Sequence, residues 1–154
     1  MIRRIVSGGQ TGVDRAALDV ALEKGIPCGG WVPKGRMAED GVIPATYPNL
    51  QETESENPEE RTAFNIRDAD ATLLVTRGKP VGGSLYTLDM AARMGKPLFH
   101  IDLEELSLPL ATRLATDWLE RMHPSILNIA GLRSSEDPEI YRLTHEVLSR
   151  ILIL

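Results

Sequence analysis

The sequence predicts an α/β fold in one domain, residues 1–154: a parallel sheet of about five strands with helices on both faces. Short apolar runs alternate with amphipathic segments along the whole chain, and this alternation is typical of parallel sheets covered by helices. Glycines stand at most of the junctions, where the chain has to turn. A length of 154 residues with 42% hydrophobic content is enough to bury one continuous core.

The first half of the chain contains two expected strands and one helix. Residues 2–6 are a short apolar run that predicts the first strand. Apolar residues then recur at helical spacing from Val13, and Gly25 is placed to end this helix. A second strand is expected over 26–32. The segment that follows is rich in proline and becomes acidic over 48–60, so we expect irregular structure up to the next helix.

The second half repeats the alternation of strands and helices. A helix is expected over 58–68, because Pro58 suits the first helical position and acidic residues follow it in the first turn. The apolar run 71–75 predicts a strand buried on both faces. The remaining expected elements are helix 85–94 with Gly95 at its end, strand 98–101, helix 110–122, strand 126–130 and helix 140–152.

Composition and charge exclude several classes of function. A net charge of −5 argues against sequence-independent binding to nucleic acid. No apolar run is long enough to span a membrane and no signal-peptide pattern is visible, so we expect a cytoplasmic protein without a membrane partner. Cys28 is the only cysteine, and His100, His123 and His145 lack the spacing of metal ligands, so the sequence predicts no metal site.

Three junctions between a strand and a helix carry glycine and polar residues: 7–14, 76–87 and 130–137. In a parallel sheet all three lie at the same edge, where ligands of such folds bind. Helix N-termini expose N–H groups there, and glycine lets a phosphate approach the backbone. The first two junctions also have a purely structural interpretation: Thr11 with Asp14 could cap one helix, and Ser84 could cap the other.

The expected ligand is therefore a phosphorylated heterocycle. Glycines and polar residues of the junctions would surround its phosphate, Trp31 would cover the ring, and nearby cations would neutralise charge. Trp31 could equally be a packing residue and Arg133 an ordinary surface arginine. The candidate binding residues are Gly8, Gly9, Gln10, Thr11, Gly12, Trp31, Lys34, Arg36, Gly82, Gly83, Ser84, Thr87 and Arg133.

Two common nucleotide-binding motifs are missing from the sequence. Gly9 and Gly12 match the last two glycines of the dinucleotide fingerprint, but Ser7 replaces the first, and the second expected strand lacks the acid that binds a ribose. The sequence G-x-x-x-x-G-K-[ST] does not occur. The first junction is thus interpreted as a phosphate-binding turn that belongs to neither an NAD-dependent oxidoreductase nor a P-loop nucleotidase.

Five ordered motifs give the chain a resemblance to a known family. They are SGGQTGVDRAALDVA, GGWVPKGRMAEDGVIP, RTAFNIRDADATLLVTRG, GGSLYTLDMAARMGKP and LNIAGLRSSEDPEIY. Together they resemble the bacterial molybdenum carrier family, over nearly the whole chain. This resemblance implies a Rossmann-like sheet and a nucleotide-like or pterin ligand such as the molybdenum cofactor (molybdopterin). That family is similar in turn to the lysine-decarboxylase-like proteins, which include cytokinin-activating phosphoribohydrolases.

The phosphoribohydrolases carry a signature, P-G-G-x-G-T-x-x-E, whose glutamate is catalytic. Gly82 and Gly83 match it here and Asp89 falls in place of the glutamate, but Val81, Leu85 and Tyr86 replace the proline, glycine and threonine.

Three hypotheses follow: a carrier for a phosphorylated heterocycle; a hydrolase of nucleotide N-glycosidic bonds; and a nucleotide-sensing signalling or scaffold domain. Asp89, Arg61 and Asp14 are the acid–base candidates of the hydrolase. The apolar tail, residues 151–154, predicts a homo-oligomer.

Overall fold

The computed structural model describes residues 1–153, and its centre is a parallel sheet of six strands in the order β5-β2-β1-β8-β6-β7. The strands are β1 (Arg4–Val6), β2 (Cys28–Val32), β5 (Leu50–Glu52), β6 (Ala71–Thr76), β7 (Leu98–Asp102) and β8 (Ile126–Gly131). The expected Rossmann-like α/β fold is confirmed, with one strand more than expected. That additional strand, β5, comes from the segment that was expected to be irregular.

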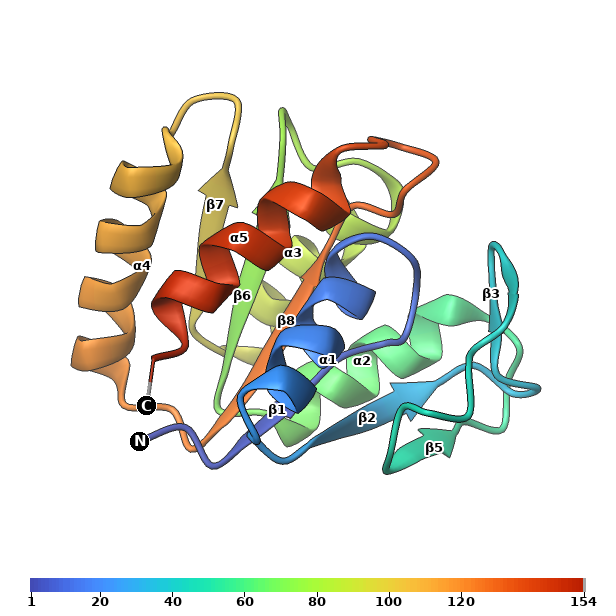
Figure 1. The fold of residues 1–154 in the computed structure, drawn as a ribbon. Helices are drawn as coiled ribbons and strands as arrows, with labels where there is room; N and C mark the ends of the chain where they lie inside the picture. The colour runs from blue at the N-terminus through green and yellow to red at the C-terminus, as the bar shows by residue number, and fades with distance from the viewer. Residues whose placement is uncertain (154) are drawn as a thin grey trace.

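Helices cover both faces of the sheet (Figure 1). They are α1 (Val13–Glu23), α2 (Pro58–Asp68), α3 (Gly82–Met94), α4 (Leu108–Met122) and α5 (Ile140–Ile151). Helix α5 packs against α1 and α4 on one face, and α2 packs against α3 on the other. A small hairpin of β3 (Met37–Ala38) and β4 (Gly41–Val42) stands apart from the sheet.

Local sequence explains where two of the helices begin. Helix α2 begins at Pro58, as expected, and the Asn57 side chain accepts a hydrogen bond of 3.0 Å from the Glu59 N–H. Helix α3 begins at Gly82, three residues earlier than the sequence pattern suggested, so its first turn contains both glycines of the junction. Both glycines therefore lie at the N-terminus of α3.

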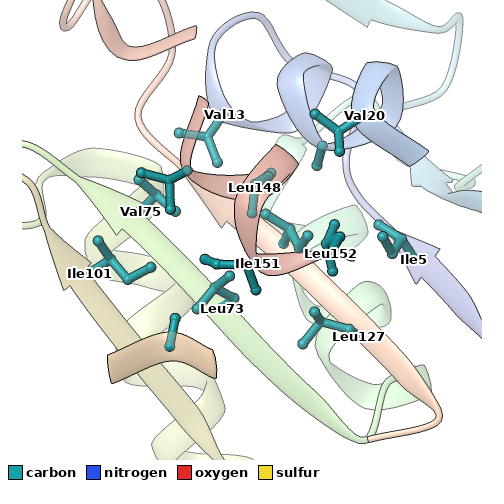
Figure 2. Packing of buried hydrophobic residues seen from close by; sticks show 14 of the residues in the cluster. Ile5, Val13, Val20, Leu73, Val75, Ile101, Leu127, Leu148, Ile151 and Leu152 are labelled. Atoms are coloured by element: carbon teal, nitrogen blue, oxygen red, sulfur yellow. The ribbon is translucent and has the colours of Figure 1, made fainter. Parts of the chain in front are cut away.

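The core lies between the sheet and the face formed by α1, α4 and α5 (Figure 2). Strand residues such as Ile5, Leu73 and Leu127 are fully buried there, against Val13 and Leu148 from the helices. Strand β6 is buried along its whole length, as expected for a central strand with helices on both sides. Residues of β1, β8 and β6 thus all belong to this core, which fixes their positions in the sheet.

The C-terminal tail contributes to this core. Ile151 and Leu152 are buried, with 8% and 3% of their surface exposed, whereas Ile153 is exposed. Leu154 lies outside the described residues. Because two residues of the tail are already covered within the chain, they offer little apolar surface to a second copy, and the homo-oligomer stays a prediction. Separately, no helix within residues 1–153 has the length and apolar character needed to cross a membrane.

Candidate functional site

A cleft of about 340 Å³ opens at the carboxyl edge of the sheet, where the chain leaves β1 and β8. On the other side of the cleft lie the N-termini of α2 and α3. These two helices cover the face of the sheet opposite to α1 and α5. The cleft therefore sits where neighbouring strands send their connections to different faces, the usual ligand site of open α/β sheets. Its lining residues are Gly8, Gln10, Asp14, Asn57, Pro58, Glu59, Arg61, Thr62, Asn65, Gly82, Gly83, Tyr86, Thr87, Asn128, Ala130, Gly131, Arg133 and Glu136.

Arg61 is the central cation of the cleft. It lies in the first turn of α2, and its guanidinium donates hydrogen bonds to the carbonyls of Gly8, at 3.4 Å, and Pro58, at 3.3 Å, and to the Thr62 hydroxyl. Within residues 1–153 it forms no ion pair with a carboxylate, although it is partly buried. A Cβ at Gly8 would lie 2.5 Å from Arg61 Nε, so glycine is needed there for the guanidinium to occupy this position.

Asp14 is the buried acid of the cleft, in the first turn of α1. Its Oδ2 accepts a hydrogen bond of 3.1 Å from the Gln10 N–H. Burial is the largest influence and raises the pKa of Asp14, while the positive charge of Arg61 acts in the opposite direction. The same two influences act on Arg61 with the opposite signs: burial lowers the pKa of its guanidinium, and the Asp14 charge raises it. Cation and acid are thus electrostatically coupled without forming an ion pair.

The N-terminus of α3 faces the cleft through Gly82 and Gly83, and both residues are exposed. Apart from the adjoining residues and the backbone of α3 itself, no atom of residues 1–153 lies within 4 Å of a Cβ built at Gly83, so this part of the wall is open. The Ser84 side chain bonds to the backbone of Val81, the residue before the helix. Its Oγ accepts from the Val81 N–H at 2.8 Å and donates to the Val81 carbonyl at 2.7 Å. The Ser84 N–H donates to the Val81 carbonyl at 3.0 Å, whereas the N–H groups of Gly82 and Gly83 have no acceptor within residues 1–153. Free N–H groups at a helix N-terminus favour an anion.

Tyr86 and Asn128 add an aromatic ring and an amide to the cleft wall. Tyr86 follows the glycines by one turn of α3 and is partly buried. Asn128 lies in β8 and is 2% exposed, and its amide donates to the Thr72 hydroxyl at 3.2 Å. A ring beside a hydrogen-bonding amide can hold a flat polar molecule by stacking and by contact with its edge.

A family model described as the circularly permutated YpsA SLOG family matches residues 5–152. The chain belongs to this family. In the sheet of this chain the last strand, β8, lies between β1 and β6. The two described ends of the chain lie close together (Figure 1), since one hollow is lined by Met1, Ile2, Ile151, Leu152 and Ile153. Neighbouring ends permit circular permutation.

The crystal structure of a protein from Syntrophus aciditrophicus SB, named "Putative molybdenum carrier protein", is similar to this SLOG-family chain throughout. The TM-score is 0.96 and the sequence identity 47%, over 99% of this chain and 96% of the other. This similarity confirms the resemblance to molybdenum carrier proteins that the five motifs indicated. No match was found among proteins of curated function.

The cleft brings together some of the candidate residues predicted from the sequence. Those that line it are Gly8, Gln10, Gly82, Gly83, Thr87 and Arg133, together with the two acid–base candidates Asp14 and Arg61. The third acid–base candidate, Asp89, is exposed on α3 and does not line the cleft.

Gly9 and Gly12 serve the fold of the first junction. A Cβ at Gly12 would lie 2.4 Å from the Leu132 carbonyl oxygen, and its φ of 80° is one that side chains rarely adopt. At Gly9 a Cβ would lie 2.8 Å from the Ile43 side chain. Neither glycine lines the cleft. Close packing of the chain around each position explains why glycine stands there.

Thr11 and Ser84 use their hydroxyls within the protein. The Thr11 hydroxyl donates to the carboxylate of Glu39, and Ser84 completes the start of α3 as described above. Neither residue lines the cleft.

Trp31, Lys34 and Arg36 lie outside the cleft, although the sequence suggested an aromatic and cationic wall. The Trp31 indole N–H donates to Asp68 at 2.8 Å, and its ring packs edge-on against Phe64 of α2. Lys34 is exposed. Arg36 donates to the carbonyls of Ile43 and Pro44, at 3.1 and 3.0 Å, and so holds the base of the β3–β4 hairpin.

Other residues of the wall went unnoticed in the sequence. Asn128 and Asn65 carry a usable signal, because each is a polar residue at a buried position of an otherwise apolar pattern. The Asn65 amide, however, is already hydrogen-bonded to the backbone of Trp31. It accepts from the Trp31 N–H at 2.8 Å and donates to the Trp31 carbonyl at 3.0 Å. Tyr86 carries no such signal, since a tyrosine in an amphipathic helix is ordinary.

Proposed function

We propose that the chain is a binding protein for a phosphorylated heterocyclic ligand held in this cleft, and that the ligand is the molybdenum cofactor. The observation that carries the proposal is Arg61. It is a partly buried guanidinium in the cleft wall, its hydrogen bonds go to neutral oxygens, and no carboxylate pairs with it among residues 1–153. A cation in such a place is favoured when an anion binds beside it.

The neighbouring groups support a phosphate as that anion. The N-terminus of α3 presents the backbone of Gly82 and Gly83 to the same cleft, and a helix N-terminus stabilises negative charge. The volume of about 340 Å³ is near the lower end of small-molecule sites, which span roughly 300–1,000 Å³. A ligand of the size of a mononucleotide fits this volume better than a dinucleotide does.

The remaining wall suits a polar ring. Tyr86 offers an aromatic face and Asn128 an amide, and both line the cleft. Trp31, the ring-stacking candidate from the sequence, is engaged with α2 and is not used in this proposal.

The molybdenum cofactor meets these requirements, since it combines a pterin ring with a phosphate. The Syntrophus protein, similar over the whole chain, is named as a molybdenum carrier. No group of three or more His, Cys, Asp or Glu residues in the described part of the chain could hold a metal ion. Molybdenum would therefore be carried on the sulfur ligands that the pterin itself supplies, while Arg61 and α3 would hold the phosphate.

The first experiment compares two arginines of the same helix, with AMP as the probe. Arg61→Ala is expected to weaken AMP binding in isothermal titration calorimetry at least tenfold, because hydrogen bonds to a charged group contribute about 1.5–3 kcal/mol. Arg67→Ala is the matched control: Arg67 is exposed on α2 and paired with Asp68 at 2.8 Å, and its loss should change AMP affinity less than twofold. Equal binding of adenosine and AMP would contradict a phosphate site.

The second experiment concerns the identity of the ligand. Protein purified without air from its native host is expected to carry a pterin, visible as fluorescence after oxidation, together with molybdenum in native mass spectrometry. If AMP binds and depends on Arg61 but neither pterin nor molybdenum ever co-purifies, the phosphate site stands and the cofactor assignment is refuted.

One observation favours a second candidate function, the hydrolysis of nucleotide N-glycosidic bonds. Asp14 is a buried acid in the cleft wall whose pKa is raised mainly by burial, and a protonated carboxyl can donate a proton to a leaving base. Release of free base from nucleoside monophosphates, lost in Asp14→Asn, would support this alternative. If no free base is released from any of the common nucleoside monophosphates, the hydrolase alternative is refuted and the proposed carrier function is retained.

A further inference from the structure

A second anion-binding arrangement lies at the rim of the cleft and holds a carboxylate of the protein itself. Glu39, at the tip of the β3–β4 hairpin, accepts hydrogen bonds from the Thr11 hydroxyl, from the Ser135 N–H at 3.1 Å and from the Ser135 hydroxyl at 2.6 Å. Arg133 Nε lies 3.6 Å from the same carboxylate. We call the four groups that surround Glu39 the rim cradle: the Thr11 hydroxyl, the Ser135 N–H, the Ser135 hydroxyl and the Arg133 guanidinium.

The donors of the rim cradle are fixed by contacts of their own. The Thr11 hydroxyl accepts a hydrogen bond of 3.1 Å from the Ser134 N–H, and its proton is therefore directed toward Glu39. Arg133 is also 3.8 Å from Glu136, whose carboxylate accepts from the Arg133 N–H at 3.1 Å. These contacts do not involve Glu39, so they would remain if its carboxylate left.

The hairpin is held in place without the Glu39 carboxylate as well. Its neighbour Asp40 forms a two-point ion pair with Arg15, at 2.8 and 2.9 Å, and Arg15 also donates to the Gly9 carbonyl. The Glu39 N–H donates to the Gln10 side chain at 2.9 Å. A rotation of the Glu39 side chain alone would thus empty the rim cradle while the hairpin stayed docked.

Glu39 is accessible enough to leave and is charged at neutral pH. About a fifth of its side chain, 21%, is exposed. Burial raises the pKa of Glu39, but the hydrogen bonds from Ser135 and Thr11 and the charge of Arg133 outweigh burial and lower it. The rim cradle therefore binds an anion in this structure, and the anion happens to be tethered to the chain.

Two hydroxyls, a backbone N–H and a guanidinium are also the groups that bind phosphates and carboxylates of ligands. Two residues connect the rim cradle to the main cleft, because both also line the main cleft. They are Arg133, a member of the rim cradle, and Gln10, which accepts from the Glu39 N–H. We propose that the rim cradle is a second anion subsite, in which a phosphate or carboxylate group of a ligand replaces the Glu39 side chain.

This inference rests on the proposed function for the rest of the ligand, and it extends the ligand class to molecules that carry a second anionic group. One group would lie at Arg61 and α3, and the other at the rim. A ligand with a single phosphate would bind with Glu39 still in place. A diphosphate, or a phosphate ester with an additional acid, would displace it.

The test uses inorganic phosphate as the probe and two neighbouring acids of the hairpin tip. Glu39→Ala empties the rim cradle, so phosphate is expected to bind about tenfold more tightly than to the wild type in isothermal titration calorimetry. Asp40→Ala is the matched control, because it breaks the ion pair with Arg15 and leaves Glu39 in place; its phosphate affinity should stay within twofold of the wild type. No gain in Glu39→Ala, or an equal gain in Asp40→Ala, would overturn the proposal.

The same pair of variants is then measured with Arg61→Ala added. The gain from Glu39→Ala should persist there, because the rim cradle does not contain Arg61, whereas loss of AMP binding in Arg61→Ala alone tests the main cleft. Failure of one subsite is thus distinguishable from failure of the other. If Glu39→Ala does not fold, Glu39→Gln is measured in its place. The neutral glutamine side chain competes with phosphate more weakly than glutamate does, so phosphate affinity should still rise about threefold over the wild type. No rise in phosphate affinity would refute the subsite.

Discussion

Replacement of Gly8 by alanine tests the main cleft without removing any of its charges. A Cβ at this position would lie 2.5 Å from Arg61 Nε, 2.9 Å from Cδ and 3.0 Å from Cζ, whereas ordinary contacts begin at 3.4 Å. The guanidinium therefore has to move by about an ångström. If it then loses a charged hydrogen bond to the ligand phosphate, the cost is about 1.5–3 kcal/mol, or roughly ten- to 150-fold in AMP affinity.

The fold should tolerate this change. The atoms that a methyl group would meet belong to a flexible side chain, and Gly8 is not among the glycines with positive φ. Alanine also restricts the unfolded chain, which is worth about 0.4–1 kcal/mol in favour of folding. We expect the melting temperature to stay within about 4 °C of the wild type, since 1 kcal/mol corresponds to roughly 2–4 °C at this size.

A double-mutant cycle provides the decisive measurement. AMP affinity is measured by calorimetry for the wild type, Gly8→Ala, Arg61→Ala and the double variant. If the methyl group acts by moving Arg61, Gly8→Ala has no further effect once Arg61 is gone. The reasoning is refuted if Gly8→Ala binds AMP as the wild type does, or if it weakens binding by the same factor in both backgrounds.

Two further predictions concern stability and pH. Burial raises the pKa of Asp14 in the folded state. The ionised carboxylate therefore lowers the stability of the fold at pH 7, and lowers it less at pH 4.5, which is nearer the unfolded pKa of about 3.9. Asp14→Asn should raise the free energy of unfolding by urea at pH 7, with a smaller gain at pH 4.5. The hydroxyls of Tyr47 and Tyr141 both donate to Asp19, the first at 2.7 Å. Burial is the larger cause and these hydrogen bonds the next, and both raise the pKa of the two phenols. The stability that the phenols contribute is complete below pH 10 and is lost as the pH rises further, so the double Phe variant should be less stable than the wild type at pH 8 and closer to it at pH 10.5.

Each of these expectations has an opposite outcome that would count against it. An Asp14→Asn variant less stable than the wild type at both pH values would mean that the buried acid contributes to stability, contrary to its raised pKa. A difference between the wild type and the double Phe variant that stays constant from pH 8 to 10.5 would show that the two phenols titrate normally in the folded protein.

Several parts of the fold could be predicted because local sequence encodes them. Helix α2 begins where Pro58 and its acidic neighbours indicated, and β6 is buried as its apolar run predicted. Strand β5 was missed, since its three residues are partly or fully exposed and two of them, Gln51 and Glu52, are polar. Such a short edge strand exists because β2 pairs with it, and pairing leaves no periodic signal in three residues.

The candidate site was predicted less completely. Gly82 and Gly83 were recognised because glycines at a junction are visible in the sequence. Trp31 was assigned to the site on its chemistry, but its contacts with Phe64 and Asp68 direct it toward α2. These contacts join residues more than 30 positions apart, and no local pattern reveals them.

The sequence by itself determined the alternation of strands and helices, the glycine junctions and the family resemblance, because these depend on residues close together in the chain. Only the tertiary structure decided which groups face one another. Strand β8 enters the middle of the sheet beside β1, while α2 crosses to the opposite face, and this arrangement brings Gly8, Arg61 and Asn128 to one cleft. The physical reason is that such contacts follow from the order of strands and the packing of helices on the sheet, to which residues from the entire chain contribute together.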